Sequence, residues 1–317
     1  MVMVYLFFVL GIILLTKSAN WIVDSSSSIA KRFGVSSLII GLTIVAFGTS
    51  LPELVVNLMA AFSGNGEIAF GNVIGSNIAN VLLVLGIVAV IGNVRFKHET
   101  IWNEIPFALL AAFVLFVLTG NLFGAKEFLI RDDGFILLGL FVAFLYYVFV
   151  MAKRGNKEFD ISSIVGRSNW KIGLKLVLGV VGIYFGGKWV VDGAVVIASQ
   201  LGLSEFLISA TVIALGTSLP ELVVSIAAVR RGDIDLAVGN VIGSNVFNIC
   251  WVLGIVPLIS PLAIPAFIGL DIGVMFLATL LLFVFVFVGK KGHISRTEGI
   301  VFLLSYVLYI WYVIIRG

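Results

Sequence analysis

The sequence predicts an all-α membrane protein in which ten transmembrane helices form two inverted repeats of five helices each. Three observations indicate this fold class. The composition is too apolar for a soluble protein, the apolar residues fall into ten long runs, and one block of sequence occurs twice. The repeated block also carries the residues from which we infer a function.

Composition alone assigns the chain to the membrane. Of its 317 residues, 61% are hydrophobic and 12% are charged, and the mean hydropathy is +1.18. A soluble domain carries about 25% charged residues, so too little polar surface is present to cover a soluble globule. The net charge of +3 does not indicate nucleic-acid binding, because the basic residues lie in short segments between apolar runs. The single cysteine, Cys250, excludes an intrachain disulfide framework.

The apolar runs set the number of helices, because a bilayer core about 30 Å thick needs about 20 apolar residues per helix. By this rule we expect ten spans, at residues 2–24, 37–62, 67–91, 102–121, 132–152, 170–198, 205–229, 235–259, 263–288 and 296–315. The first run has the apolar character of a signal peptide but lacks a basic segment before it. We therefore expect it to be retained as the first helix.

The longest polar connection divides the chain into two sets of five helices. We expect residues 1–152 to form the first repeat, residues 153–169 a cytoplasmic linker and residues 170–317 the second repeat. Basic residues set the orientation, because cytoplasmic loops are enriched in Lys and Arg. With the N-terminus outside, most Lys and Arg residues of the connecting segments are cytoplasmic, and this bias predicts that both termini lie outside.

One block of sequence occurs twice, at a distance of 168 residues. The motif GTSLPELVV occupies residues 48–56 and 216–224, and GNVIGSN occupies residues 71–77 and 239–245. Between residues 43–86 and 211–254, 25 of the 44 positions are identical without a gap. Because each repeat has an odd number of helices, the second copy enters the membrane from the opposite side. Inverted repeats of this kind are common in secondary transporters, whose substrate sites lie near the bilayer midplane.

Proline is expected to break a helix within each copy of the block. Pro52 removes a backbone donor and clashes with the carbonyl of Gly48 one turn earlier, and Pro220 does the same at Gly216. We therefore expect the carbonyls of the turn 46–49, and of its counterpart 214–217, to lose their helical partners. A free carbonyl in hydrocarbon is costly unless another group binds it. A cation does this well, and transporters build ion sites from broken helices.

A glutamate follows each proline by one residue. Glu53 and Glu221 lie inside apolar stretches, where an acid requires a partner. Ca²⁺ prefers roughly 6–8 oxygen ligands, including bidentate carboxylates, and two carboxylates neutralise its charge. Na⁺ also prefers oxygen but carries half the charge, so neutral hydroxyls and carbonyls suit it. The block supplies such hydroxyls beside the glutamates, at Thr49, Ser50, Thr217 and Ser218.

The second motif places further polar groups on one helix face. Residues four apart share a face, and the pairs Ser76 with Asn80 and Ser244 with Asn248 have this spacing. We expect this face to point at the broken helices. The glycines of the motif, at 71, 75, 239 and 243, allow close helix approach. Its asparagines suit interhelical hydrogen bonds as well as cation binding; they are Asn72, Asn77, Asn240 and Asn245.

The remaining chemistry is less specific. No cluster of His and Cys accompanies the block, which argues against Zn²⁺ and other soft metals. Asp24 and Asp192 are expected to cap helices or to form ion pairs near helix ends. Glu104 and Asp271 lie near the ends of their predicted helices, so interfacial positions explain them better than an ion pathway does.

The paired blocks resemble the alpha-1 and alpha-2 repeats of the Ca²⁺/cation antiporter superfamily, which contains the sodium/calcium exchangers. The resemblance is greatest to the short prokaryotic members without a regulatory loop, and it covers essentially the whole chain. The alpha-1 region corresponds to about residues 43–86 and the alpha-2 region to about 211–254. The resemblance implies an exchanger-like fold in the plasma membrane of a prokaryote, with both termini outside.

The resemblance also implies sets of ion ligands. Glu53 and Glu221 look like the central Ca²⁺ ligands, joined by the backbone carbonyls of Thr49 and Thr217. One flanking Na⁺ site is expected to contain Ala46, Thr49, Ser50 and Ser76. The other is expected to contain Ala214, Thr217, Ser218 and Ser244. Asn80 and Asn248 are expected to line the central cavity, and because some relatives carry aspartate where this chain has Asn248, the asparagine disfavours K⁺ co-transport.

The implied function is secondary active antiport of Na⁺ for Ca²⁺ by alternating access. Two carboxylates are neutralised by one Ca²⁺ and left with one excess positive charge by three Na⁺, so we expect electrogenic 3:1 exchange. The alternative is H⁺/Ca²⁺ antiport, because a buried glutamate can also carry a proton. A Ca²⁺-permeable channel is a weaker reading, and an enzyme is the weakest. Beyond these ions and the lipid bilayer, we expect no cofactor, no nucleic acid and no obligatory protein partner.

Overall fold

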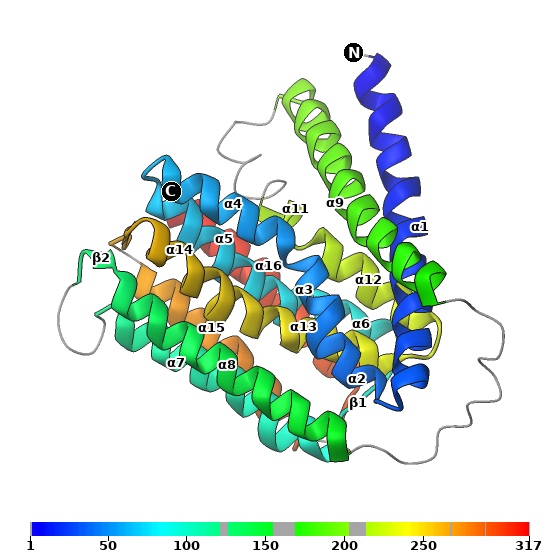
Figure 1. Cartoon of the computed structure of the whole chain (residues 1–317). Helices are drawn as coiled ribbons and strands as arrows, with labels where there is room; N and C mark the ends of the chain where they lie inside the picture. Colours follow the sequence, from blue (N-terminus) through cyan, green and yellow to red (C-terminus); the bar gives the residue numbers. More distant parts are fainter. Residues whose placement is uncertain are drawn as a thin grey trace.

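The computed structural model describes residues 2–120, 126–154, 169–202, 214–266, 268–288 and 290–316. Within these ranges the regular structure is helical except for four strands of two residues each. Most long helices lie side by side in one bundle (Figure 1). Two of them, α1 and α9, pack on each other and stand at an angle to the rest (Figure 1).

The first half of the chain begins with an unbroken helix, continues with a broken one, and ends with the long helix that precedes the linker. Its elements are α1 (Val2–Phe33), α2 (Ser37–Ile40), the π-helix η1 (Gly41–Val45), α3 (Ala46–Thr49), α4 (Leu51–Phe62), α5 (Gly66–Ala79), the π-helix η2 (Asn80–Val84), α6 (Leu85–Ile91), β1 (Val94–Arg95), the π-helix η3 (Thr100–Glu104), α7 (Ile105–Leu118), β2 (Phe128–Leu129) and α8 (Arg131–Arg154).

The second half repeats this order in its described part. Its elements are α9 (Asn169–Gln200), α11 (Ala214–Gly216), α12 (Leu219–Arg230), α13 (Ile234–Val246), the π-helix η6 (Phe247–Val252), α14 (Leu253–Ile259), β3 (Leu262–Ala263), α15 (Ile268–Phe285), β4 (His293–Ile294) and α16 (Arg296–Arg316). Residues 155–168 of the predicted linker lie outside the described ranges.

The number of membrane spans agrees with the sequence as far as the described residues reach. Eight helices are long and apolar enough to cross a membrane, and the bent pair Ser37–Thr49 with Leu51–Phe62 makes nine if it forms one span. The remaining predicted span, 205–229, includes residues 205–213, which lie outside the described ranges. The count of ten therefore stays a prediction.

Two predicted boundaries are wrong. α1 continues to Phe33, well past the predicted end at residue 24. Ser25 and Ser26 of this extension are buried, so these two polar side chains pack against protein and do not meet lipid. The span predicted to begin at residue 263 begins at Ile268, because Ala263 belongs to β3 and Pro265 lies in the connection that follows.

Each copy of the repeated block contains a helix break at the same place. Ser50 has φ −87° and ψ 3°, and α4 begins directly after it with Pro52 in its first turn. Ser218 has φ −85° and ψ 0° and is followed in the same way by α12. Proline is tolerated in a first turn, where its missing N–H has no intrahelical partner to lose. The first broken helix bends by 41° at this point.

Two short strand pairs, which we call clasps, join the halves of the chain. β1 pairs antiparallel with β4, and β2 pairs antiparallel with β3. β1 and β3 hold corresponding positions in the repeats, because Val94 and Leu262 are 168 residues apart. β1 and β2 lie toward opposite ends of α7 and α8 (Figure 1). One clasp therefore ties the two halves together at each end of the bundle.

α1 and α9 pack closely through small residues. A methyl group added to Gly11 of α1 would lie 3.0 Å from the carbonyl oxygen of Gly186 on α9. One added to Gly179 of α9 would lie 3.2 Å from the carbonyl oxygen of Ser18. Small residues of this kind let two helix backbones approach each other in a membrane. The two helices consequently form a tight pair.

A polar stripe on α1 contacts the turn between α12 and α13. Asp24 forms ion pairs with Arg231 of this turn and with Lys175 of α9, the second at 2.6 Å. Ser27 Oγ donates to Asp233 Oδ2 at 3.1 Å. The prediction that Asp24 forms an ion pair is confirmed, although the residue lies inside α1 and not near its end.

The broken helix and α13 cross at backbone contact. A methyl group on Gly239 would lie 2.5 Å from the carbonyl oxygen of Leu38, and one on Gly41 would lie 2.7 Å from that of Leu236. A methyl on Gly243 would lie 2.8 Å from the Cα of Leu42. The predicted role of the motif's glycines in close helix approach is confirmed at 239 and 243, whereas a methyl group on Gly71 or Gly75 would meet no described atom within 4 Å.

Gly239→Ala tests this crossing. The added methyl meets backbone atoms that cannot move aside, so we expect overpacking to cost about 1–3 kcal/mol. The midpoint of thermal unfolding of the detergent-purified protein should fall. Gly139→Ala in α8 is the matched control, because a methyl there meets no described atom within 4 Å. An unchanged midpoint for Gly239→Ala would contradict a backbone contact at this crossing.

Candidate functional site

The two repeated glutamates lie in the interior of the bundle. Glu53 and Glu221 are 0% exposed, and each occupies the first turn of the helix that follows a break. Their carboxylates are close enough for their charges to interact. The N-terminus of a helix favours a negative charge, but two carboxylates in a low-dielectric interior repel each other. The pair therefore calls for compensating positive charge.

Hydroxyl groups from both repeats surround the Glu221 carboxylate. Ser244 Oγ donates to Glu221 Oε1 at 3.2 Å and lies 3.2 Å from Thr49 Oγ1. Thr49 and Ser50 also lie beside the Glu221 carboxylate. We call Glu221, Ser244 and Thr49 half-site A. Its hydroxyl oxygens come from both halves of the chain.

The Glu53 carboxylate has the corresponding surroundings. Ser76 Oγ donates to Glu53 Oε1 at 3.5 Å and lies 3.2 Å from Thr217 Oγ1. We call Glu53, Ser76 and Thr217 half-site B. The 168-residue shift relates each member of one half-site to a member of the other: Glu53 to Glu221, Ser76 to Ser244 and Thr49 to Thr217.

The contacts between these hydroxyls do not follow the predicted grouping of the Na⁺ ligands by repeat. We expected Thr49 beside Ser76 and Thr217 beside Ser244, whereas each threonine contacts the serine of the other repeat. The reason is the helix packing: α3 contacts α13, and α11 contacts α5. Because the broken helix of one half packs against the polar helix of the other, each half-site combines both repeats.

Two asparagines of the repeated motif bond the backbone of the glutamates. Asn72 Nδ2 donates to the Glu53 carbonyl oxygen at 3.5 Å, and Asn240 Nδ2 donates to that of Glu221 at 3.4 Å. The Thr49 hydroxyl donates to Asn240 Oδ1 at 3.1 Å. These asparagines therefore form hydrogen bonds between helices and hold the turn that carries each glutamate.

The other asparagines form a reciprocal set. Asn80 Nδ2 donates to Asn245 Oδ1 at 3.0 Å, and Asn248 Nδ2 donates to Asn77 Oδ1 at 3.3 Å. The 168-residue shift converts one bond into the other. Asn80 and Asn248 each form these hydrogen bonds through the amide nitrogen, so their Oδ1 atoms remain available as acceptors. Both lie where an α-helix passes into a π-helix, a feature frequent at functional sites.

Six buried oxygens of the predicted ligands have no hydrogen-bond partner among the described residues. They are Ser50 Oγ and Ser218 Oγ, Glu53 Oε2 and Glu221 Oε2, and Asn80 Oδ1 and Asn248 Oδ1. The members of each pair are related by the shift of the repeat. A buried acceptor without a partner costs about 1–3 kcal/mol, and native interiors hold few of them. A symmetric set of hard oxygens with two carboxylates fits a cation of the Na⁺ or Ca²⁺ kind.

The alanines of the predicted sites require one correction. The carbonyl of Ala46 accepts a helical hydrogen bond from Ser50 N at 2.9 Å. The expectation that the whole turn loses its helical partners is therefore wrong at Ala46, because Pro52 removes only the donor that Gly48 would use. A carbonyl oxygen has two lone pairs, so this bond does not exclude Ala46 as a ligand. Ala214 begins α11, but its side chain lies outside the described part of the chain.

The other acidic residues singled out in the sequence have partners outside the half-sites. Asp271, in the first turn of α15, accepts two hydrogen bonds from Arg316, at 3.0 and 2.9 Å. Glu104 is fully buried at the end of η3 and accepts a hydrogen bond from the Tyr147 hydroxyl. Both contacts tie neighbouring helices together.

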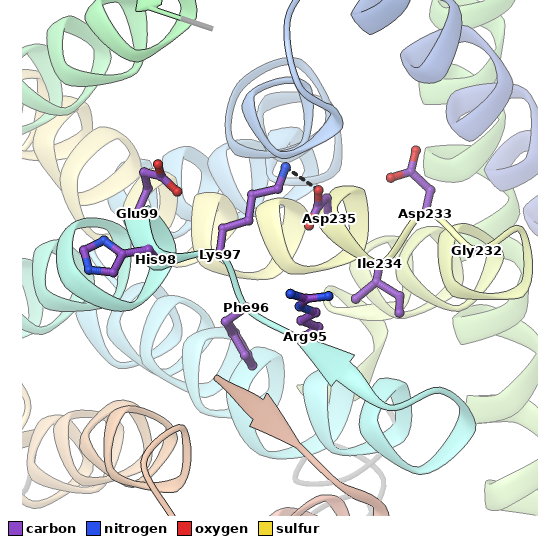
Figure 2. Close-up of a pocket in the computed structure, with 9 residues that line it drawn as sticks. All are labelled: Arg95, Phe96, Lys97, His98, Glu99, Gly232, Asp233, Ile234 and Asp235. Carbon is purple, nitrogen blue, oxygen red and sulfur yellow. Dashed lines mark ion pairs between the residues drawn. The ribbon is translucent and has the colours of Figure 1, made fainter. Parts of the chain in front are cut away.

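A surface pocket of about 560 Å³ lies apart from these residues. Segment 95–99 and turn 232–235 line it, and Lys97 forms an ion pair with Asp235 across it (Figure 2). Acidic and basic side chains occur in similar number around it, so their charges largely compensate. None of the predicted ligands lines the pocket, and the predicted chemistry belongs to the buried site.

Asn57 is a buried polar residue that is not among the ligands predicted from the sequence. It lies one turn after Glu53 on α4, is 0% exposed, and donates through Nδ2 to the Glu53 carbonyl oxygen at 2.7 Å. The signal was present, because a spacing of four residues places it on the face of the glutamate. The repeat obscures it, since the second copy has Ser225 at this position.

Known proteins are similar to this chain over nearly its whole length. The profile of a family described as sodium/calcium exchanger protein matches residues 3–150 and 172–315. The CaxA protein of Alkalimonas amylolytica is 40% identical over 98% of both chains. Sodium/calcium exchanger MaX1 of Methanosarcina acetivorans is 32% identical over 96% of this chain and 97% of its own.

The fold matches a solved exchanger as well. The structure of the sodium-calcium exchanger NCX_Mj soaked with 2.5 mM Na⁺ and 0.1 mM Ca²⁺ has a TM-score of 0.82 and 34% sequence identity, and the match covers 98% of both chains. Each of the two segments that the family profile matches includes one copy of the repeated block. The chain therefore belongs to the sodium/calcium exchanger protein family.

Proposed function

We propose that this protein is a secondary active antiporter that exchanges Na⁺ for Ca²⁺ across the membrane. The observation that carries the proposal is the set of six unpartnered, buried oxygens around two carboxylates, related in pairs by the repeat. Family membership supports it, because MaX1 and NCX_Mj are both named sodium/calcium exchangers. Na⁺ and Ca²⁺ are the transported substrates, and side chains of the bundle bind them in turn.

Ca²⁺ is bound at the centre, between Glu53 and Glu221. The two carboxylates and the carbonyls of Thr49 and Thr217 supply about six oxygens, within the range that Ca²⁺ prefers. One Ca²⁺ neutralises both carboxylates and removes the repulsion between them. We expect the Oδ1 atoms of Asn80 and Asn248, which have no hydrogen-bond partner among the described residues, to line this central position. This central position explains why one oxygen of each glutamate has no hydrogen-bond partner among the described residues.

Na⁺ is bound at the two half-sites and competes with Ca²⁺ at the centre. Each half-site offers one carboxylate and neutral hydroxyls, which suit a monovalent cation. We assign Ala46 and Ser50 to half-site A, and Ala214 and Ser218 to half-site B. Three Na⁺ leave one excess positive charge on the two carboxylates, whereas one Ca²⁺ leaves none. Exchange of 3 Na⁺ for 1 Ca²⁺ is therefore electrogenic.

We infer that residues 1–152 and 170–317 are inverted repeats of five helices each, joined by a linker at 153–169. The clasps support this, because the corresponding strands β1 and β3 belong to different clasps. The crossed composition of the half-sites supports it too, because broken helices of opposite direction present equivalent groups to each other. Ten helices complete this arrangement, and half-sites A and B lie on opposite sides of the Ca²⁺ position.

Access alternates when the α1–α9 pair slides across the rest of the bundle. These two helices are unbroken and have 32 residues each. Their contact through Gly11 and Gly186 supports movement as one body. An ion-loaded site, in which charge is compensated, crosses the apolar barrier, whereas two bare carboxylates do not. This difference couples the movement of one ion species to that of the other.

The protein belongs to the plasma membrane of a prokaryote, with both termini outside. The distribution of Lys and Arg supports the orientation, because cytoplasmic segments are enriched in them. The relatives of comparable length come from a bacterium and an archaeon, Alkalimonas amylolytica and Methanosarcina acetivorans, which supports the location.

H⁺/Ca²⁺ antiport is the second candidate. One observation favours it: two fully buried carboxylates lie close enough to interact. A proton on one of them would remove their repulsion without any Na⁺. Na⁺ accounts for more of the site, because the hydroxyl oxygens of the half-sites have no role in proton binding.

Glu53→Gln should abolish exchange. Losing one partner of a buried charge site costs about 3–5 kcal/mol, so Na⁺-driven uptake of radioactive Ca²⁺ into proteoliposomes should fall at least about 100-fold. Glu67→Gln is the matched control, because Glu67 is exposed in the first turn of α5 and should leave the rate unchanged. Full uptake by Glu53→Gln would refute the proposed Ca²⁺ site.

The crossed half-sites predict which double variants are coupled. Thr49→Val and Ser244→Ala both alter half-site A, so their effects on half-saturating Na⁺ should deviate from additivity by about 0.5–3 kcal/mol. Thr49→Val and Ser76→Ala alter different half-sites and should be additive within about 0.5 kcal/mol. The half-saturating Na⁺ concentration for Ca²⁺ exchange measures both pairs. Stronger coupling in the second pair would restore the grouping by repeat.

Ion gradients distinguish Na⁺ from H⁺ coupling. Vesicles loaded with Na⁺ should take up Ca²⁺, and an inside-positive potential should accelerate the uptake, because 3:1 exchange carries net positive charge out of the vesicle. A pH gradient without Na⁺ should drive no uptake. Radioactive Ca²⁺ uptake at potentials set with K⁺ and valinomycin measures this. Insensitivity to potential would exclude 3:1 exchange, and uptake driven by the pH gradient would favour the second candidate.

A further inference from the structure

Within the repeated blocks, residues 43–86 and 211–254, the buried oxygens that have no hydrogen-bond partner among the described residues match with one exception. Six of them form three pairs under the 168-residue shift, and all six belong to predicted ion ligands. The seventh within the repeated blocks is Asn57 Oδ1, which has no counterpart. At the corresponding position Ser225 Oγ accepts a hydrogen bond from Asn240 Nδ2 at 3.1 Å. The feature that marks the predicted ligands therefore also marks Asn57, in one half only.

The orientation of the Asn57 amide is fixed by its neighbour. Its Nδ2 donates to the Glu53 carbonyl oxygen at 2.7 Å. If the amide were flipped, its oxygen would lie at this distance from the carbonyl oxygen, and two acceptors would face each other. The contact therefore fixes which end of the amide is the nitrogen. Asn57 Oδ1 must then point away from this carbonyl. The side chain is 0% exposed, and this oxygen has no hydrogen-bond partner among the described residues.

The position of Asn57 extends the predicted site along α4. The buried residues of this helix form one stripe, Glu53, Asn57, Ala60 and Ala61, which runs from the glutamate to the far end of the helix. Asn57 is the polar member that follows the glutamate on it. A cation beside Asn57 Oδ1 is about one helical turn from the Glu53 carboxylate, close enough to be attracted by its charge.

We propose that Asn57 Oδ1 is an additional Na⁺ ligand, next to half-site B and without an equivalent at half-site A. The inference rests on the proposed exchange of Na⁺ for Ca²⁺. An amide oxygen is a neutral ligand, and the stripe adds no second carboxylate, so the position suits a monovalent ion better than Ca²⁺. Na⁺ bound next to Glu53 then has a ligand that Na⁺ bound next to Glu221 lacks. The two halves of a site with matched motifs thus differ in Na⁺ affinity.

Equilibrium binding tests the proposal without relying on transport. A ligand that binds the folded state raises the midpoint of thermal unfolding, so this midpoint reports binding by the purified protein in detergent. We would titrate Na⁺ in the absence of Ca²⁺, and Ca²⁺ in the absence of Na⁺. The concentration that gives half of the maximal stabilisation is compared between variants. Ser63→Ala is the matched control, because Ser63 is exposed at the end of α4 and bonds only its own helix.

Three substitutions separate the roles of the two amide atoms. Asn57→Leu removes both atoms at similar volume, and Asn57→Ser introduces the residue of the second repeat. Asn57→Asp keeps an oxygen and adds charge but removes the donor to the Glu53 carbonyl. We expect Asn57→Leu and Asn57→Ser to raise the half-saturating Na⁺ concentration roughly threefold to tenfold, as for one lost ligand. The half-saturating Ca²⁺ concentration should change less than about twofold. Asp should bind Na⁺ at least as well as the wild type.

Two results would overturn the proposal. If Leu and Ser leave the Na⁺ titration unchanged, the oxygen holds water at most. If Asp weakens both ions as Leu does, Asn57 acts by positioning Glu53 through its nitrogen. Failure of the exchange hypothesis is a separate result, because the wild type itself would then show no stabilisation by Na⁺. Asn57→Ser keeps the test available if Asn57→Leu does not fold.

Discussion

The repulsion between two buried carboxylates is the constraint on which this structure depends. Glu53 and Glu221 are fully enclosed and close enough to interact, so they are tolerable only with positive charge nearby. The surrounding groups are hydroxyls and amides, which bring no charge of their own. Several of their oxygens have no hydrogen-bond partner in the described part of the chain, although a protein interior normally satisfies such groups. The bundle thus leaves buried oxygens available to coordinate a cation.

The backbone provides the geometry for this arrangement. The prolines end one helical segment and start the next, so each glutamate occupies a first turn, where the helix N-terminus favours its charge. Contact between Gly41 and Gly239 brings the first broken helix against α13, and this contact sets Thr49 beside Ser244. Packing at backbone distance therefore serves the chemistry directly, because a larger residue at the crossing would separate the two hydroxyls.

Much of the fold and of the site follows from the sequence, and the exceptions have physical reasons. Apolar runs, prolines and the duplicated motif identify the long helices and the breaks, because each is a local property. Thr49 contacts the serine of the second repeat, and Thr217 that of the first. These contacts depend on how the helices cross, and no sequence pattern within one repeat predicts the crossing. The clasps escape prediction because two residues are too short for a periodic signal. Asn57 was not predicted because the second repeat has a different residue, Ser225, at the corresponding position. The two side chains also form different hydrogen bonds.

The clasps bear on how such a chain could have arisen. One clasp joins β1, which follows α6 in the first half, to β4, which precedes α16 in the second half. The other joins β3, which follows α14 in the second half, to β2, which precedes α8 in the first half. Neither half therefore forms a clasp alone. Two separate copies of a five-helix chain would form the same two contacts in a closed, two-fold homodimer, in which equivalent surfaces pair with each other. Fusion of the gene would preserve both contacts and free each half to diverge. The difference between Asn57 and Ser225 is a divergence that identical subunits could not express.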